Sequence, residues 1–413
     1  MLDLLVMTKI YQNFMKKIMN ALIIFACFSI AMPTAWISVA SAFLLFTWII
    51  SGDYSEKYRV IIKNPAAVSV MILFCLYLIA TIYSSGTFKD SSTFLLKYAK
   101  LLIIPIIISI AITKKVRDDG MKAFLFGAFI LLSISYFKWL GIIPMDLGLH
   151  DLPDNSQGYL AFKNRIAHNI LMAFFMFVLL SKAYFEKTQW RWMWLIIALL
   201  TLIDLMYLVG GRSGQVIALS FVIFLPLYFY GRKAYKYFLI AAITIFMLHK
   251  QLESFMPGRL LETSQEISEH KSDEHLTSAG IRLEMYKNTL LLIKQSPLFG
   301  YGTGALRSEY SKLTNSQDTL LKDVPNPHNQ YLLTFFELGI VGLTALFYTF
   351  FCFWKTSNII ARSDKYAGMY LKGVILTISI GAMFNSLLLD ATEGKFFCVL
   401  TGLLLSAYTQ KNA

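Results

Sequence analysis

The sequence predicts an all-α integral membrane protein with about twelve transmembrane helices and one large loop that itself contains helices. The composition is 56% hydrophobic and 15% charged, whereas soluble domains carry about 25% charged residues. The stretches 66–83, 101–112 and 193–208 are long, nearly free of charge and flanked by basic residues. Short basic clusters then alternate with loops that are poorer in Lys and Arg, as in multi-pass proteins.

Each predicted helix is an apolar stretch of about 15 to 25 residues. In chain order we expect spans at 19–33, 35–51, 65–84, 93–113, 121–141, 166–183, 192–210, 213–230, 234–249, 329–353, 367–388 and 395–409. The first follows Lys16 and Lys17 without an obvious small-residue cleavage site, so we interpret it as a retained helix instead of a signal peptide. The chain therefore divides into transmembrane helices over 1–249, a loop domain over 250–328, and further transmembrane helices over 329–413.

The basic clusters predict the orientation of the spans. Every second loop, counted from the amino terminus, is rich in Lys and Arg, and such loops face the cytoplasm. Both termini are then cytoplasmic, and the long loop lies on the opposite side. The formal net charge of +13 is dispersed over these loops instead of forming one stripe, so it does not indicate nucleic-acid binding.

The long loop is polar at first and then predicts a helix over 280–295, with Ser278 as its N-cap. The glycine-rich run at 297–304 lacks the Lys-Ser/Thr pair of a P-loop, so we expect a turn that permits close backbone packing. All four cysteines lie in apolar segments, and only His270 and His275 stand close together in this loop. The sequence therefore indicates no disulfide framework, no metal site and no cofactor.

Arginines near outer helix ends are the first candidates for chemistry. Arg212 and Ser213 lie in the motif Gly-Gly-Arg-Ser-Gly at 210–214, where a guanidinium and exposed backbone amides suit an anion. Arg212 is alternatively a snorkelling anchor. Arg282 on the loop helix is either a second bidentate phosphate ligand or an ordinary solvated charge. Arg165, His168, Lys97 and Lys100 either extend an anion-attracting funnel or anchor their helices at the interface.

His328 and two carboxylates complete the candidate set. His328 lies in Pro-Asn-Pro-His-Asn-Gln at 325–330, just before an apolar span, where a general base is able to meet a lipid-carried substrate. A helix-capping role is the alternative. Glu337 lies deeper in the same span and needs a partner, which we expect to be a cation. Asp390 either orients the histidine, balances the arginines, or is a solvated loop carboxylate.

Several motifs together resemble the O-antigen ligase family within the O-antigen ligase/polymerase superfamily. They are Gly-Arg-Ser-Gly at 211–214, Ile-Arg-Leu-Glu-Met-Tyr at 281–286, Pro-Leu-Phe-Gly-Tyr-Gly at 297–302, His-Asn-Gln-Tyr at 328–331 and Glu-Leu-Gly-Ile-Val-Gly at 337–342. The specific part of the resemblance covers about residues 200–395, and the amino-terminal half matches only in hydropathy.

This resemblance implies a GT-C-like, metal-independent, inverting membrane glycosyltransferase of the bacterial inner membrane, with its active site facing the periplasm. It would transfer a polysaccharide from undecaprenyl pyrophosphate to a sugar hydroxyl of lipid A–core and complete lipopolysaccharide. By the resemblance, Arg212 and Arg282 hold the pyrophosphate, His328 is the catalytic base, and Asp390 matches a late acidic residue of ligases. Ser213, Arg165, Tyr286 and Asn329 are assigned to substrate binding.

Three other functions remain open on the sequence. An O-antigen polymerase uses the same carrier but joins one carrier-linked chain to another. A protein O-oligosaccharyltransferase has extra carboxy-terminal sequence that this chain lacks. A polysaccharide or lipid transporter would spread its intramembrane charges along a pathway, whereas the candidates here gather on one face.

Overall fold

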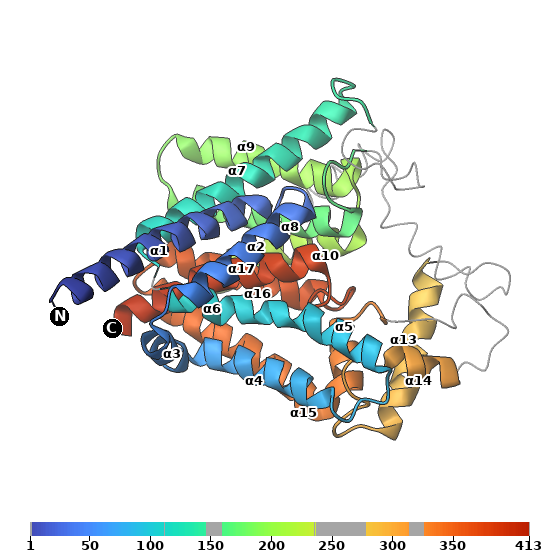
Figure 1. The fold of residues 1–413 in the computed structure, drawn as a ribbon. Helices are drawn as coiled ribbons and strands as arrows, with labels where there is room; N and C mark the ends of the chain where they lie inside the picture. Colours follow the sequence, from blue (N-terminus) through green and yellow to red (C-terminus); the bar gives the residue numbers. More distant parts are fainter. Residues whose placement is uncertain are drawn as a thin grey trace. The chain divides into compact units, whose positions relative to one another are not determined.

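The computed structural model describes residues 2–110, 112–145, 159–234, 236, 278–313 and 326–412 (Figure 1). Within these ranges the chain forms helices and turns, and no strand. The predicted all-α class is therefore confirmed for the described residues. The chain divides into two compact units, here called unit 1 (Met1–Gly127 and Ile281–Ala413) and unit 2 (Ala128–Gly280).

Unit 1 contains both ends of the chain and the described part of the long loop. Its helices are α1 (Leu2–Ser29), α2 (Thr34–Ile50), α3 (Tyr54–Ile62), α4 (Pro65–Ala80), α5 (Phe88–Tyr98), η1 (Ala99–Leu102), α6 (Ile103–Ser109), the first half of α7 (Lys114–Trp139), α13 (Ser278–Gln295), α14 (Leu306–Leu313), α15 (Gln330–Ala361), α16 (Lys365–Gly381) and α17 (Ala391–Asn412). Helix α15 packs against α4 and α16, and α17 packs against α6 and α16.

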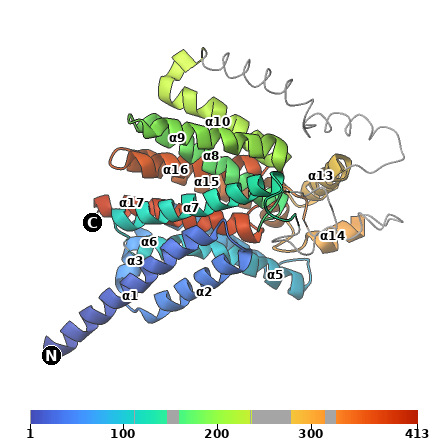
Figure 2. The ribbon, with the colours of Figure 1, turned by 90° about the horizontal axis from the view of Figure 1, so that it is seen from above.

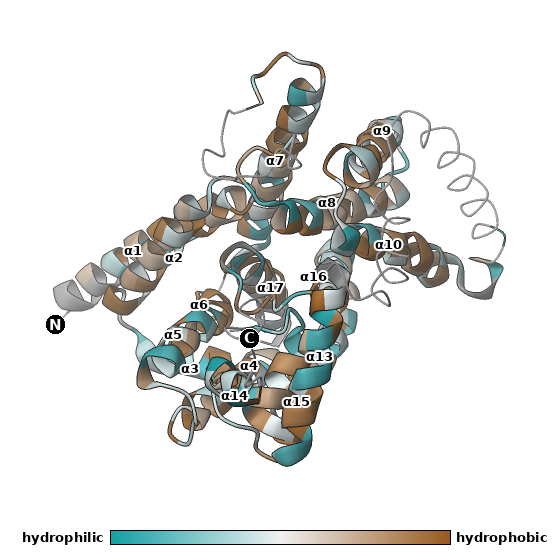
Figure 3. Cartoon of the chain, turned by 90° about the vertical axis from the view of Figure 1, so that its right-hand side faces the viewer, coloured by the Kyte–Doolittle hydropathy of each residue, from teal (hydrophilic) through white to brown (hydrophobic). Residues whose placement is uncertain are grey.

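The two ends of the chain lie at the same end of unit 1. Figures 1 and 2 show α1 beginning and α17 finishing there, with α13 and α14 at the opposite end. By the colouring of Figure 3, α13 is a mixture of hydrophilic and hydrophobic residues, whereas α15 is mainly hydrophobic. The α13 and α14 end of unit 1 thus lies opposite the end that contains both termini, and the side of the membrane on which each end lies stays a prediction.

Unit 2 is built around α8 (Arg165–Phe185), which packs against both α9 (Trp190–Ile203) and α10 (Arg212–Tyr230). A single π-helical turn, η3 (Asp204–Leu208), follows α9, and a short 3₁₀ turn, η4 (Gly231–Ala234), follows α10. The side chain of Asn164 accepts a hydrogen bond from the Ala167 amide and so caps α8. Because the residues that follow are nearly all apolar, α8 continues as a buried helix.

Among the described residues, six helices are long and apolar enough to cross a membrane, or seven if α2 and α3, bent by 116°, form one span. Several such helices in one chain make this a multi-pass membrane protein. Helices also cover the other predicted spans, except 234–249, which lies almost wholly outside the described residues. The shorter or more polar helices α1, α4, α16 and α17 do not meet the same length and hydropathy criteria, so the full count of about twelve crossings stays a prediction.

Helix α15 is interrupted, and this interruption shapes the loop domain. Gly339 has φ 63° and ψ −162°, which no helix contains. A Cβ atom at this position would lie 2.1 Å from the carbonyl oxygen of Leu298. Only glycine permits both this conformation and this approach. The glycine-rich run therefore packs directly on the α15 backbone, as its sequence predicted.

Candidate active site

The candidate base, His328, lies in a tight turn just before α15. Its backbone has φ 52°, a left-handed conformation that is uncommon outside glycine and that concentrates at functional sites. The Asn326 side chain stabilises this turn by accepting a hydrogen bond from the His328 amide at 2.9 Å. Asn329, not His328, caps α15, with its side-chain oxygen 3.0 Å from the Tyr331 amide and 3.1 Å from the Leu332 amide. The helix-capping role that was the alternative for His328 is therefore filled by its neighbour Asn329.

Helix α13 brings Arg282 and Tyr286 close to the turn that contains His328. The Tyr286 hydroxyl lies 3.3 Å from the His328 carbonyl oxygen and 3.2 Å from the Met383 carbonyl oxygen, and it donates to one of them at a time. Arg282 is on the preceding turn of the same helix and is half-buried. The structure therefore brings Arg282 and Tyr286 close to His328, which follows them by more than forty positions in the sequence.

The electrostatics of this cluster suit a base. Burial, followed by the positive charge of Arg282, lowers the pKa of His328 from its ordinary value of 6.5. The neutral imidazole, which is able to accept a proton, is then the main form at neutral pH. Burial raises the pKa of Tyr286, while Arg282 acts in the opposite direction, so Tyr286 stays a neutral hydrogen-bond donor.

The segment between α16 and α17 packs against the His328 turn. The Ser386 hydroxyl is 2.5 Å from the Asn326 side-chain oxygen, and the Leu388 amide donates to the Gln330 side chain at 3.0 Å. Asp390 ends this segment. Burial raises the pKa of its carboxyl group, while Lys100 and Lys97 act to lower it. The structure thus places Asp390 on the segment that supports the histidine.

Both predicted funnel lysines, Lys97 and Lys100, have structural contacts, and so does Asn329. The Lys100 ammonium donates to the backbone oxygens of Leu389 at 2.9 Å and Asp390 at 2.7 Å. The Lys97 ammonium makes a cation–π contact with Phe94, at 5.3 Å from the ring centroid. The Asn329 amide also donates to the Met383 carbonyl at 3.1 Å. Substrate binding by Asn329 stays a prediction.

Arg212 and Ser213 open α10 in unit 2, and Arg165 opens α8 of the same unit. The glycines around Arg212 have a packing role, because a Cβ atom at Gly211 or Gly214 would lie 2.5 Å from atoms of Asn169 on α8. The short Gly-Arg-Ser-Gly turn is thus able to lie directly against α8. Arg212 is half-buried at the amino terminus of α10, which fits either predicted role.

A buried His168–Asp204 pair supports this turn and was missed by the sequence analysis. The His168 Nε2 atom is 2.8 Å from the Asp204 carboxylate, and both side chains are fully buried. His168 is therefore neither a funnel residue nor an interfacial anchor, and that expectation was wrong. Asp204 begins the π-helical turn, and Gln215 of α10 donates to the carbonyls of Leu205 at 3.3 Å and Met206 at 3.4 Å. The signal that could have found it is the lone carboxylate of Asp204 within the predicted span 192–210.

Over the described part of the chain, no group of three or more His, Cys, Asp or Glu side chains is placed to hold a metal ion. His270 and His275 lie outside the described residues. The absence of a metal from the reaction stays a prediction.

Comparisons with known proteins give one family match, and its range overlaps this site. Residues 195–347 match the family model described as O-antigen ligase. The chain is also 28% identical over 174 residues to an uncharacterized protein of Haemophilus influenzae, a match that covers 40% of this chain and 42% of that relative. The matched segment contains Arg212, Arg282 and His328 but neither Arg165 nor Asp390.

Members of this family are membrane glycosyltransferase-like enzymes that include both ligases and polymerases. The family match and the helical fold agree with each other, because both indicate a multi-pass membrane protein. Residues 195–347 of this chain therefore belong to the O-antigen ligase/polymerase superfamily.

Proposed function

We propose that this protein is an O-antigen ligase of the bacterial inner membrane. It transfers a polysaccharide from undecaprenyl pyrophosphate to a sugar hydroxyl of lipid A–core on the periplasmic face, and it thereby completes lipopolysaccharide. The arrangement of Arg282, Tyr286 and His328 in one polar cluster at the end of unit 1 opposite both termini carries the proposal. Both termini are then cytoplasmic, with the α13 and α14 end in the periplasm.

The chemistry follows from the charges of the cluster. As the bond between the anomeric carbon and the pyrophosphate oxygen breaks, negative charge builds up on the leaving group. Arg282 and Arg212 are the proposed guanidinium ligands for this charge, and they make a metal ion unnecessary. Arg282 lies near enough to His328 for its charge to act on the imidazole. Arg212 is included because of its match to the family motif Gly-Arg-Ser-Gly.

His328 is the proposed general base. Its neutral imidazole accepts the proton of the acceptor hydroxyl as that oxygen attacks the anomeric carbon from the side opposite the pyrophosphate. One such displacement inverts the configuration at that carbon. Asp390, on the segment that packs against the His328 turn, is proposed to support the imidazole. The preference for a ligase over a polymerase rests on the resemblance of Asp390 to a late acidic residue of ligases.

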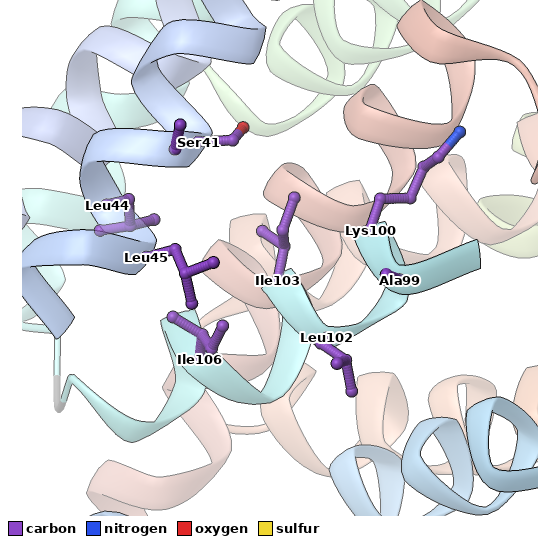
Figure 4. A pocket seen from close by; sticks show the side chains of 9 residues that line it. Ser41, Leu44, Leu45, Ala99, Lys100, Leu102, Ile103 and Ile106 are labelled. Carbon is purple, nitrogen blue, oxygen red and sulfur yellow. The ribbon is translucent and has the colours of Figure 1, made fainter. Parts of the chain in front are cut away.

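The carrier also needs room for its hydrocarbon tail. Unit 1 contains a pocket of about 280 Å³ between α2 and the η1–α6 segment. Figure 4 shows Ser41, Leu44 and Leu45 on one wall, and Ile103 and Ile106 on the other. The lining is almost wholly apolar, and Lys100 on its rim is bonded to the Asp390 backbone. We propose that part of the polyprenyl chain occupies this pocket.

The test is made in cells that lack the protein and are complemented with wild type or with His328→Gln. Lipopolysaccharide gels and analysis of the carrier lipid are the two measurements. The proposal expects full-length polymer to accumulate on the carrier, with lipid A–core left uncapped, in the His328→Gln cells. Arg282→Gln should give the same result, and Arg307→Gln is its matched control, since Arg307 forms a half-exposed ion pair with Asp90 at 3.6 Å.

Two results would contradict the proposal. If the His328→Gln protein is present in the membrane at wild-type abundance and still caps lipid A–core normally, His328 is not the general base. Core that carries single repeat units, with long chains absent, identifies a polymerase instead.

A further inference from the structure

The interruption of α15 exposes backbone groups that a continuous helix would use internally. At Gly339 the helix is broken, and the released carbonyls of Phe336 and Glu337 accept hydrogen bonds from the amides of Tyr301 and Gly302, each at 2.9 Å. Beyond the break, the Ile340 amide donates to the Pro297 carbonyl at 2.8 Å. The glycine-rich run therefore takes the place of one helical turn of hydrogen bonds.

The side chain of Glu337 binds the same run. It is fully buried, and one carboxyl oxygen accepts a hydrogen bond from the Gly304 amide at 2.7 Å. The other oxygen accepts from the Tyr98 hydroxyl, also at 2.7 Å. The Tyr98 ring stacks on Tyr77 with 3.7 Å between centroids. The partner of Glu337 is thus a pair of neutral donors, and the expectation of a cation was wrong.

The glycines of the run make these contacts possible. A Cβ atom at Gly300 would lie 2.4 Å from the Phe336 carbonyl oxygen, and one at Gly302 would lie 2.3 Å from the Ser84 Cα atom. Both residues have positive φ. The run is held from its other side as well, because the Thr303 hydroxyl donates to the Tyr77 carbonyl at 2.8 Å. Its place between α4 and α15 is therefore tightly constrained.

The run begins directly after α13, the helix that carries Arg282. Helix α13 ends at Gln295, and Pro297 already contacts α15. Earlier on α13, Tyr286 contacts the carbonyl of His328, which stands just before α15. Helix α13 is therefore attached to the His328-bearing segment at two points, one next to His328 and one at Glu337.

We propose that Glu337 is a positioning residue: by binding the glycine-rich run, it fixes α13 so that Arg282 stays beside His328. The effect of Glu337 on catalysis rests on the proposed function, whereas its effect on the position of α13 does not. The side chain of Glu337 contacts the Tyr98 hydroxyl and the Gly304 amide, and in this proposal it acts through the run and through α13. The chemistry of Arg282 and His328 then depends on a carboxyl group buried among the helices of unit 1.

The test compares wild type with Glu337→Gln in the purified full-length protein. An amide has one accepting oxygen, so its NH₂ group must face either the Tyr98 hydroxyl or the Gly304 amide, and one donor loses its acceptor. We expect hydrogen exchange at the Gly302 and Gly304 amides to become about tenfold faster, the effect of losing one buried hydrogen bond.

A second measurement follows Arg282 itself. Carbethoxylation of His328 by diethyl pyrocarbonate, read by peptide mass spectrometry against pH, reports the pKa of that histidine. The Arg282 charge helps to lower this pKa, so displacement of α13 shifts the midpoint to higher pH. A residue with a merely structural role at a distance would leave this midpoint unchanged.

Glu309→Gln is the matched control, because Glu309 is a largely buried acid of α14 whose partner is Lys312 at 2.6 Å. It should change neither the exchange at Gly302 and Gly304 nor the His328 midpoint. Tyr98→Phe removes one bond to Glu337 but retains the ring that stacks on Tyr77, and it should give a smaller change in the same direction.

Both measurements work without substrate, so they are independent of the ligase proposal. If exchange and midpoint stay at wild-type values in Glu337→Gln and Tyr98→Phe, the positioning role is overturned, even if transfer is lost in cells. If both change as expected, the role stands, and the lipopolysaccharide gels decide separately whether the reaction is ligation.

Discussion

The buried His168–Asp204 pair gives a prediction whose size follows from the structure. The two side chains are fully buried and meet at 2.8 Å, and the second nitrogen of His168 and the second oxygen of Asp204 have no other partner among the described residues. Asp204→Leu leaves the imidazole buried without its partner, which costs about 1–3 kcal/mol. His168→Phe leaves the carboxyl in the same situation. The double variant replaces both by apolar groups and should cost less than the sum.

The assay is thermal unfolding in detergent, followed by the loss of the monodisperse peak in size-exclusion chromatography. Unit 2 runs from Ala128 to Gly280, and for a domain of about that size 1 kcal/mol corresponds to about 2–4 °C. Each single variant should then lower the unfolding temperature by about 2–12 °C. Asp204→Asn, which retains an acceptor, should lose least. Strict additivity of the two single variants would refute the reasoning, because it would mean that the pair does not interact.

Three further predictions concern unit 1. As the proposed base, His328 must be neutral to act, and its pKa lies below the ordinary 6.5; transfer by wild type should therefore fall only at pH values under 6.5, by about tenfold per pH unit. Arg282→Gln should raise the pKa of His328 and so move this acidic limb of the pH–rate profile to higher pH. An unmoved limb would mean that the charge of Arg282 does not act on His328. Gly302→Ala should destabilise the protein by about 2–5 kcal/mol in detergent unfolding, since its φ is +92° and the added Cβ would meet Ser84; wild-type stability would contradict the close contact. Leu44→Trp fills the apolar pocket and should raise the apparent KM for the carrier-linked donor about three- to tenfold with little change in kcat, whereas Phe46→Trp, 59% exposed on the same helix, should not.

Much of the fold was accessible from the order of residues alone. Long apolar stretches require helices in a membrane, because only helices satisfy their own backbone there. Regular alternation of basic and less basic loops predicted the side of each terminus, and unit 1 has both ends of the chain opposite α13. The helix over 280–295 was also predicted, and the structure has it at Ser278–Gln295.

Part of the candidate site was accessible in the same way. His328 stood out because it is a rare histidine between prolines and an apolar span, and Arg282 belonged to a recognisable motif. These are local signals, and residue type with its immediate neighbours is enough to find them. The meeting of Arg282, Tyr286 and His328 was not local, because it requires α13 to pack against the start of α15.

The sequence by itself determined three features of this protein: a helical membrane fold, a polar loop, and residue types suited to anion binding and proton transfer. Only the tertiary structure decided which buried polar groups are paired. Glu337 finds the Tyr98 hydroxyl and the Gly304 amide, and Asp204 finds His168. These pairings depend on distances between atoms far apart in the chain, and a polar group removed from water must bond with whatever donor or acceptor the packing brings within about 3 Å.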